Sequence, residues 1–296
     1  MSAAAQRVPE DVWVEISHHV DDPRDLASLA RVSAIHGAAA TPRLYRAVTL
    51  RTAKAVSSWI RALQGKDTAF FRSHVRTFVA LLCPRGVRGL LVRAHKHGLT
   101  AKFALALSSV HSLHAHPSIV RALWTHFPGR LDITYLSLDG SCSLDDRHLE
   151  CVLFAPLSPL QVRLFAMQTL VIHDWKLAMP AITEFHVNVT GSPALREVVL
   201  VVLYEQLECM LYVPQICAFT EAVLRLPSLS SALYVVRHDE PDQIREGTMF
   251  GVLSHFRDPR VLVAAVPQHY DAGRSAADTD QIGWWSRLNA VRVHSS

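Results

Sequence analysis

Seventeen histidines make metal binding the first chemistry to consider in this chain. His111, His114 and His116 lie close together, and imidazole is a common ligand of zinc, copper and iron. On a strand, however, side chains alternate between the two faces, so His111 and His114 would point in opposite directions. We therefore expect structural roles for these histidines and predict no metal site.

A second group, Cys142, His148 and Cys151, has spacing close to that of metal ligands. It lacks a further ligand nearby, and the chain contains no Cys-x-x-Cys pair. The motifs of nucleotide-binding loops, of Gly-x-Ser-x-Gly hydrolases and of His-Glu-x-x-His metalloproteases are also missing. We predict that the chain is not an enzyme and that it uses no cofactor or metal.

Positive charge is concentrated in one part of the chain. Residues 26–131 carry 16 Lys and Arg against a single acid, Asp67, whereas the segments on either side are net acidic. This block could bind an acidic partner such as nucleic acid, anionic lipid or an acidic protein. We favour solvated helix faces over nucleic-acid binding, because the charges are spread out and few aromatic residues accompany them. Four arginines would form an anion-binding cluster if the fold brought them together, namely Arg76, Arg85, Arg88 and Arg93.

The composition is that of a folded protein, with half of its 296 residues hydrophobic. No apolar run reaches the roughly 18 residues of a membrane span. The first residues lack the apolar segment of a secretory signal. Five scattered cysteines suit a reducing compartment better than a disulfide framework. We expect a cytoplasmic or nuclear protein that makes no membrane contact.

The elements that would position functional residues begin with short helices before residue 50. The first should start at Pro9, because proline is tolerated in a first helical turn. Val8, Val12 and Ile16 recur on one face of this helix, with Trp13 beside them. A unit this small cannot bury a sufficient core alone, so the stripe must pack on the rest of the chain or on a partner.

Two more helices follow. Asp22 is a good N-cap and Pro23 a good first residue for the second helix, in which Leu26 and Leu29 share an apolar face. Ser33 can cap a third helix. We expect that helix to end before Pro42, because the residue preceding a proline is pushed out of the α region.

The short sequence motifs of residues 8–50 follow one another in a characteristic order. In sequence they are Pro9-Glu10-Asp11-Val12, Ile16, Asp22-Pro23-x-Asp25-Leu26, Leu29-Ala30-x-Val32 and Leu44-Tyr45-x-x-Val48-x-Leu50. Together they resemble an F-box, particularly the form common in fungal proteins, over residues 7–50. Val8 is smaller than the residue usual in the family, and His36 stands near a position that is often aromatic.

The resemblance implies a function. An F-box docks by its three helices on the Skp adaptor of a cullin–RING ubiquitin ligase, so the chain would be a substrate receptor that presents a target protein for ubiquitination. The positions implied for adaptor binding are Pro9, Val12, Ile16, Leu26, Leu29 and Val32. No covalent chemistry would be required of the chain itself.

Residues 51–296 show short strands alternating with helices, which predicts an α/β body with a parallel sheet. Expected strands are Val48–Leu50, Val75–Leu81, Val110–Ala115, Ile133–Leu138, Gln168–His173, Ile182–Val189, Leu195–Leu203, Leu233–Arg237 and Arg260–Val266. Expected helices are Val56–Leu63, Leu99–Leu107, Ser118–Phe127, Leu144–Phe154 and Pro214–Leu226. Many strand centres are about 23 to 36 residues apart, which favours an irregular leucine-rich-repeat-like strand-helix solenoid that recognises the substrate.

Two alternatives remain open from the sequence. In the first, the chain is a non-catalytic scaffold, and its F-box-like start only caps the repeat array, which needs covered ends. In the second, the basic block of residues 26–131 binds nucleic acid, and its affinity would fall steeply with salt.

Overall fold

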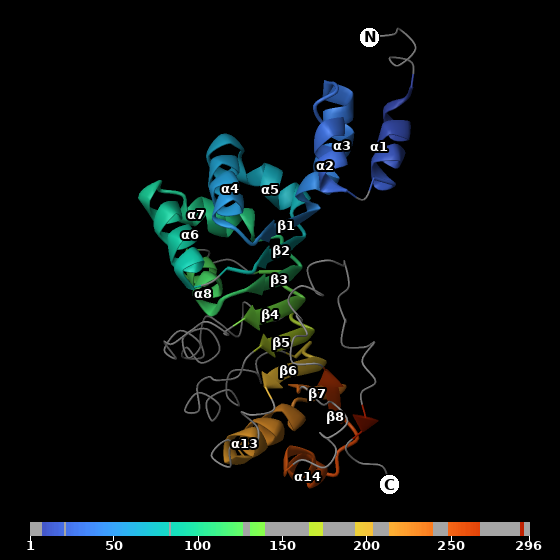
Figure 1. The fold of residues 1–296 in the computed structure, drawn as a ribbon, viewed down its shortest axis with the longest axis vertical. Helices are drawn as coiled ribbons and strands as arrows, with labels where there is room; N and C mark the ends of the chain where they lie inside the picture. Colours follow the sequence, from blue (N-terminus) through green and yellow to red (C-terminus); the bar gives the residue numbers. More distant parts are fainter. Residues whose placement is uncertain are drawn as a thin grey trace.

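The computed structural model places an N-terminal group of helices at one end of a long sheet (Figure 1). The residues that it describes are 8–20, 22–82, 84–126, 131–139, 166–173, 193–203, 213–238, 248–266 and 291–292. The predicted elements at Leu144–Phe154 and Ile182–Val189, and the group from Cys142 to Cys151, lie outside these ranges. Within the described ranges, no helix is long and apolar enough to cross a membrane.

The N-terminal unit consists of α1 (Glu10–His18), α2 (Pro23–Leu29) and α3 (Ala34–Arg46). The predicted caps are confirmed. Asp22 Oδ1 accepts a hydrogen bond from the Arg24 N–H at 2.7 Å, and Pro23 is the first helical residue of α2. Ser33 Oγ accepts from the His36 N–H at the start of α3. These side chains satisfy backbone donors that the helix itself leaves unpaired.

The prediction that the third helix ends before Pro42 is wrong, because α3 continues through Pro42 to Arg46. A proline inside a helix removes the hydrogen bond to the carbonyl four residues earlier, which is that of Ala38. Ala38 and Pro42 are both exposed, so water can satisfy that carbonyl. The helix therefore runs directly into the first strand.

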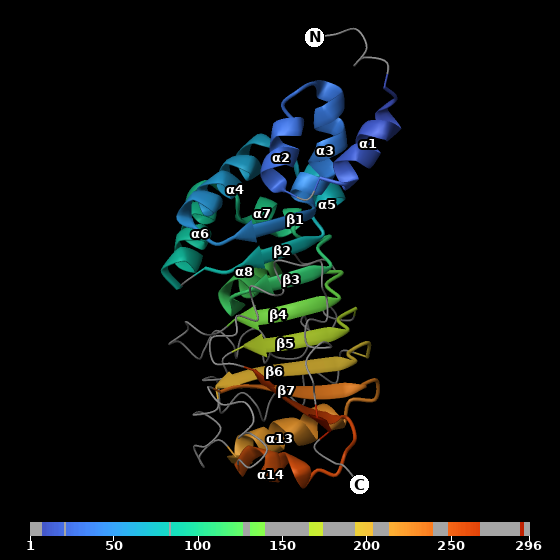
Figure 2. The same cartoon turned by 45° about the vertical axis from the view of Figure 1, so that its right-hand side comes forward.

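The strands form one sheet whose spatial order follows the chain (Figure 2). They are β1 (Ala47–Leu50), β2 (Thr77–Ala80), β3 (Ser112–Ala115), β4 (Tyr135–Asp139), β5 (Thr169–His173), β6 (Glu197–Leu203), β7 (Ser231–Arg237), β8 (Val261–Val266) and β9 (Val291–Arg292). Neighbours from β1 to β8 are parallel, and β9 runs antiparallel to β8. The predicted α/β class with a parallel sheet is confirmed, and the strand order is consistent with a leucine-rich-repeat-like arrangement.

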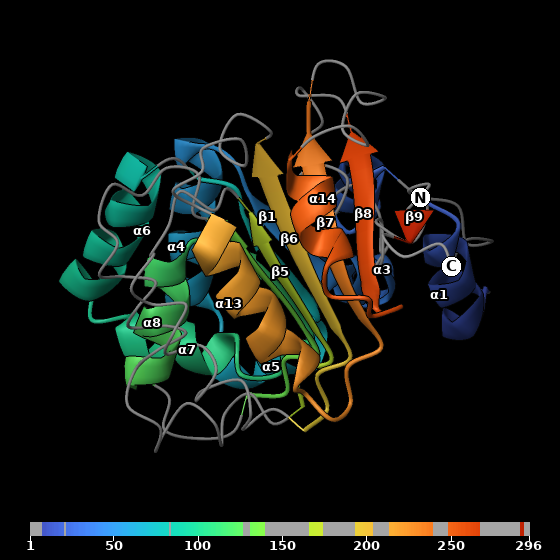
Figure 3. The ribbon, with the colours of Figure 1, turned by 90° about the horizontal axis from the view of Figure 1, so that it is seen from below.

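Helices cover one face of this sheet (Figure 3). They are α4 (Ala53–Gly65), α5 (Thr68–His74), α6 (Pro84–Lys96), α7 (Thr100–Ala106), α8 (Pro117–His126), α13 (Val213–Leu224) and α14 (Thr248–Ser254). Helices were predicted at the positions of α4, α7, α8 and α13. The pattern did not predict α5, α6 or α14, and α6 proves to line a cavity together with α4.

The core lies between the helices and the sheet. Its centre is a row of buried residues in register across seven strands, namely Phe78, Leu113, Leu136, Leu170, Val198, Ala232 and Val261. At the first strands, the Trp59 ring of α4 lies 5.1 Å from that of Phe71 and 5.6 Å from that of Phe78, centroid to centroid. This aromatic contact holds α4 and α5 against β2.

The opposite face of the sheet changes in character along its length. Its residues in β3 to β5 include the polar His114, Ser137 and His173, and those in β6 to β8 include Val199, Leu233 and Ala264. All six side chains are buried. Because successive strand residues alternate between faces, both faces of the sheet are therefore built from buried positions.

Candidate docking surface

Helix α1 is held on α3 through one face. The Trp13 ring lies 4.1 Å from that of His36, centroid to centroid. The buried Ser17 hydroxyl donates to the carbonyl oxygen of Ala39 at 3.2 Å, and Arg43 donates to the carbonyl of Ser17. Trp13 and Ser17 are one helical turn apart, so together they define the inward face of α1.

The predicted apolar stripe of α1 lies beside this face and remains in solvent. Val12 and Ile16 are 41% and 39% exposed, and they are also one turn apart. Val14 is 38% exposed and lies on the other flank of the Trp13–Ser17 face. Two aliphatic side chains on the same flank of α1 are thus available to another surface.

A second exposed apolar pair lies where α2 leads into α3. Val32 and Ile35 are 50% and 45% exposed. Leu26, in contrast, is buried, and Leu29 is half-buried. The inward residues of α2 therefore hold the N-terminal unit together, and the following turn presents aliphatic side chains to solvent. We call the four residues Val12, Ile16, Val32 and Ile35 the outward apolar residues.

The residues implied for adaptor binding fall into two groups. Pro9, which precedes α1 as its N-cap, is exposed, as are Val12, Ile16 and Val32. Leu26 and Leu29 face inward to a greater degree, so we expect them to position α2. The sequence pattern missed Val14 and Ile35. Ile35 carried a usable signal, since it is an aliphatic residue in the first turn of the predicted third helix, two residues after the Ser33 cap.

The N-terminal unit is joined to the sheet through the end of α3. The Tyr45 ring packs edge-on against the Phe70 ring of α5, with centroids 4.9 Å apart. Lys66 Nζ lies 4.0 Å from the centroid of the same Phe70 ring. The Arg76 N–H donates to the carbonyl of Arg46 at 2.9 Å, which ties β2 to the last residue of α3. The unit is therefore packed directly against the start of the sheet.

The predicted arginine cluster forms only in part. Arg85 and Arg93 line one cavity between α4 and α6, together with Arg51, which the sequence analysis did not include. Arg88 is exposed on α6 outside that lining. Arg76 donates to the carbonyls of Arg72 and Ser73 at the end of α5, at 2.9 and 3.0 Å. It therefore belongs to a different part of the surface.

A buried histidine pair lies on the sheet face away from the helices. His173 Nε2 is 3.0 Å from the Ser137 hydroxyl, and the rings of His114 and His173 are 5.3 Å apart. A hydroxyl beside an imidazole is the pairing of an activated nucleophile. All three side chains are at most 6% exposed, which favours a structural polar contact between strands. Only the strand register brings these residues together, so spacing in the sequence did not reveal them.

The described residues contain no group of three or more His, Cys, Asp or Glu side chains that could hold a metal ion. His111 is exposed, and its ring Nδ1 lies 3.0 Å from the Ser109 carbonyl, whereas His114 is buried. His111 directly precedes β3 and His114 lies within it, so the two histidines differ in environment, and the expected alternation along one strand does not apply to them.

Comparison with known proteins gives no family for this chain: no protein-family model matches it, and no curated protein matches it.

Proposed function

We propose that the chain is an F-box substrate receptor, which docks through its N-terminal unit on the Skp adaptor of a cullin–RING ubiquitin ligase. The sheet body would then present a target protein to the ubiquitin-conjugating enzyme. In this scheme the chain contributes proximity, because it raises the local concentration of target lysines near activated ubiquitin. The ordered motifs from Val8 to Leu50 and the order of α1, α2 and α3 support the proposal.

The observation that carries the proposal is the exposure of Val12 and Ile16. Their helix already has a complete inward face in Trp13 and Ser17, so the stripe is not needed for packing within the chain. Exposed aliphatic side chains that gather on one element mark a surface for interaction. Val32 and Ile35 extend the exposed apolar character of the unit.

Co-purification with the Skp adaptor tests the proposal directly. Burial of an aliphatic side chain contributes about 1.5–3 kcal/mol. The double variant Val12→Asp with Ile16→Asp should therefore bind the adaptor roughly 100-fold more weakly, or worse. Val14→Asp is the control for an aspartate on α1, because it replaces a valine of similar exposure on the other flank of that helix. Failure of the wild-type chain to bind, or equal binding by the double variant, would overturn the proposal.

The alternative is a scaffold whose N-terminal unit only caps the sheet. A cap would place its apolar stripe against the chain's own strands, so the exposure of Val12 and Ile16 favours docking. Hydrogen exchange separates the two models. Docking predicts slower exchange of the α1 amides when the Skp adaptor is added to the full chain, whereas a cap predicts no change.

A further inference from the structure

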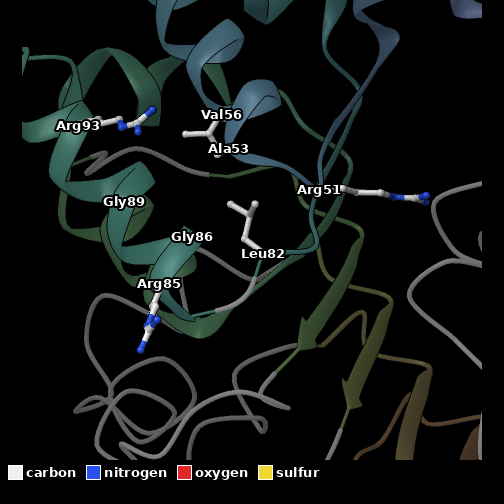
Figure 4. Close-up of a pocket in the computed structure, with 8 residues that line it drawn as sticks. All are labelled: Arg51, Ala53, Val56, Leu82, Arg85, Gly86, Gly89 and Arg93. Carbon is white, nitrogen blue, oxygen red and sulfur yellow. The ribbon is translucent and has the colours of Figure 1, made fainter.

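A cavity of about 310 Å³ lies between α4 and α6, at the edge of the sheet where β1 and β2 end (Figure 4). Arg51 directly follows β1, and Leu82 follows β2. We call this space the α4–α6 cavity. The residues that line the cavity are Arg51, Ala53, Val56, Leu82, Arg85, Gly86, Gly89 and Arg93.

The floor and the rim of the cavity differ in chemistry. Val56 is buried and Leu82 half-buried, and Figure 4 shows the Leu82 side chain extending towards α4. The guanidinium groups of Arg51 and Arg85 point outward from this apolar floor. Arg93 reaches from α6 to α4, where its guanidinium donates to the Ser57 hydroxyl at 2.7 Å. The cavity is therefore an apolar pocket with a cationic rim.

Two glycines contribute to the lining of the cavity. Gly86 and Gly89 both lie in α6 and in the cavity lining. A Cβ atom added at Gly89 would meet nothing within 4 Å, so this position faces open space. Glycine in a helix interior costs about 0.5–1 kcal/mol relative to alanine, and it nevertheless occupies a position where a side chain would fit.

The positive charge continues beyond the cavity. Arg88 and Lys96 on α6 and Lys54 on α4 are exposed, and Val92 on α6 is 54% exposed among them. Residues 26–131 contain one acid, Asp67, whose carboxylate accepts from the Phe70 N–H as the cap of α5. None of the described residues lining the cavity is acidic. Among the described residues that line the cavity, the charged side chains are therefore all cationic.

We propose that the α4–α6 cavity binds an acidic peptide segment, with an aliphatic or aromatic side chain of the peptide on the apolar floor and its carboxylates at the arginine rim. Arginine forms charge-assisted hydrogen bonds with carboxylates, often with two at once. The apolar floor suits a peptide side chain. Nucleic acid fits less well, since no aromatic residue lines the described cavity to stack a base. The cationic surface extends along two helices, which suits an extended segment.

That the bound peptide belongs to a ubiquitination target rests on the proposed function, whereas peptide binding by the cavity does not. A selection from a display library of random short peptides, on the full chain, tests it. We expect the selected peptides to combine Asp or Glu with Leu, Ile or Phe, and a labelled selected peptide to bind more weakly as salt rises. A selection without acidic enrichment would overturn the inference, as would displacement of the selected peptide by single-stranded DNA at equal concentration.

Two variants probe the rim and the floor separately. Arg85→Glu should weaken binding of the selected peptide roughly tenfold or more, and Arg72→Glu, at an exposed arginine of α5 outside the cavity, should not. Gly89→Leu should block the pocket without changing its charge, and Gly251→Leu in α14 is its control, because that glycine also faces open space. Unchanged binding by Gly89→Leu would overturn the inference, provided that thermal unfolding shows this variant to be folded.

Failure of this inference and failure of adaptor docking give different results. The double variant Val12→Asp with Ile16→Asp should retain peptide binding, and Arg85→Glu should retain adaptor binding. Loss of peptide binding in the docking variant would mean that the two surfaces are not separate, and this would contradict the assignment of the peptide to the α4–α6 cavity.

Discussion

The N-terminal unit and the sheet body differ in how much of their aliphatic surface is buried. The N-terminal unit buries small or polar residues such as Ser17, Ala39 and Ala40 and leaves Val12 and Ile16 in solvent. The body buries aliphatic residues on both faces of its sheet, as Leu170 with Val171 and Val198 with Val199 illustrate. The body thus buries most of its own aliphatic surface, whereas the N-terminal unit leaves several aliphatic side chains in solvent.

The largest effect should come from the aromatic contact at the start of the body. Phe78→Ala removes a fully buried ring that lies 5.6 Å from Trp59 and 6.0 Å from Phe103. We expect the free energy of unfolding to fall by about 3–5 kcal/mol, because a cavity replaces the ring. Denaturant unfolding measures the loss, and Val92→Ala at an exposed valine should change stability by less than about 0.5 kcal/mol. Similar values for the two variants would contradict the placement of Phe78 in the core.

A smaller and more local effect is expected in the N-terminal unit. Leu26→Ala removes the buried side chain of α2 and should lower the free energy of unfolding by about 2–3 kcal/mol, towards the low end for a leucine-to-alanine change. Hydrogen exchange should become faster in α1, α2 and α3 and stay unchanged in β5, β6 and β7. Faster exchange throughout the sheet would show that the two regions unfold as one.

The smallest effect concerns an ion pair at the far end of the body. Arg260 donates to both carboxylate oxygens of Asp258 and to the Leu224 carbonyl at the end of α13. The hydrogen bonds from Arg260 lower the pKa of the Asp258 carboxyl below its usual value of 3.8. Because the folded pKa is the lower one, the pair stabilises the fold above the unfolded pKa, and this contribution disappears as pH falls through the folded pKa.

Asp258→Asn tests this pair. The variant should be less stable than the wild type by less than about 1 kcal/mol near neutral pH, because the pair is partly exposed. The difference should vanish in strong acid, where the wild-type carboxyl is protonated. Unfolding free energies across the acid range measure it, and a difference independent of pH would show that the carboxylate charge is not what matters.

Local signals in the sequence predicted most of the elements correctly. Asp22 with Pro23 and Ser33 marked two helix starts, because a cap acts within a few residues and needs no tertiary partner. Short apolar runs bounded by turn signals located most strands of the body, because a strand that is buried on both faces of a parallel sheet is apolar along most of its length. The helix α6 was missed because Gly86, Gly89 and several arginines interrupt a stripe that Val87, Leu90 and Ala94 nevertheless supply.

The candidate sites were harder to predict. The sequence placed Val12 and Trp13 side by side, and only packing on α3 decided that Trp13 turns inward and Val12 outward. Likewise, Arg51 is 34 and 42 residues away from Arg85 and Arg93, and the parallel pairing of β1 with β2 brings them to one edge. Such contacts depend on strand order and helix direction, which no local pattern encodes.

The sequence by itself thus determined the α/β class, the parallel sheet and the apolar stripe of the first helix, because these follow from periodicity and local caps. Only the tertiary structure decided which side of α1 remains exposed, that α3 continues through Pro42, and that three separated arginines surround one cavity. The physical reason is that each of these outcomes depends on what packs against the residue, and that neighbour comes from elsewhere in the chain.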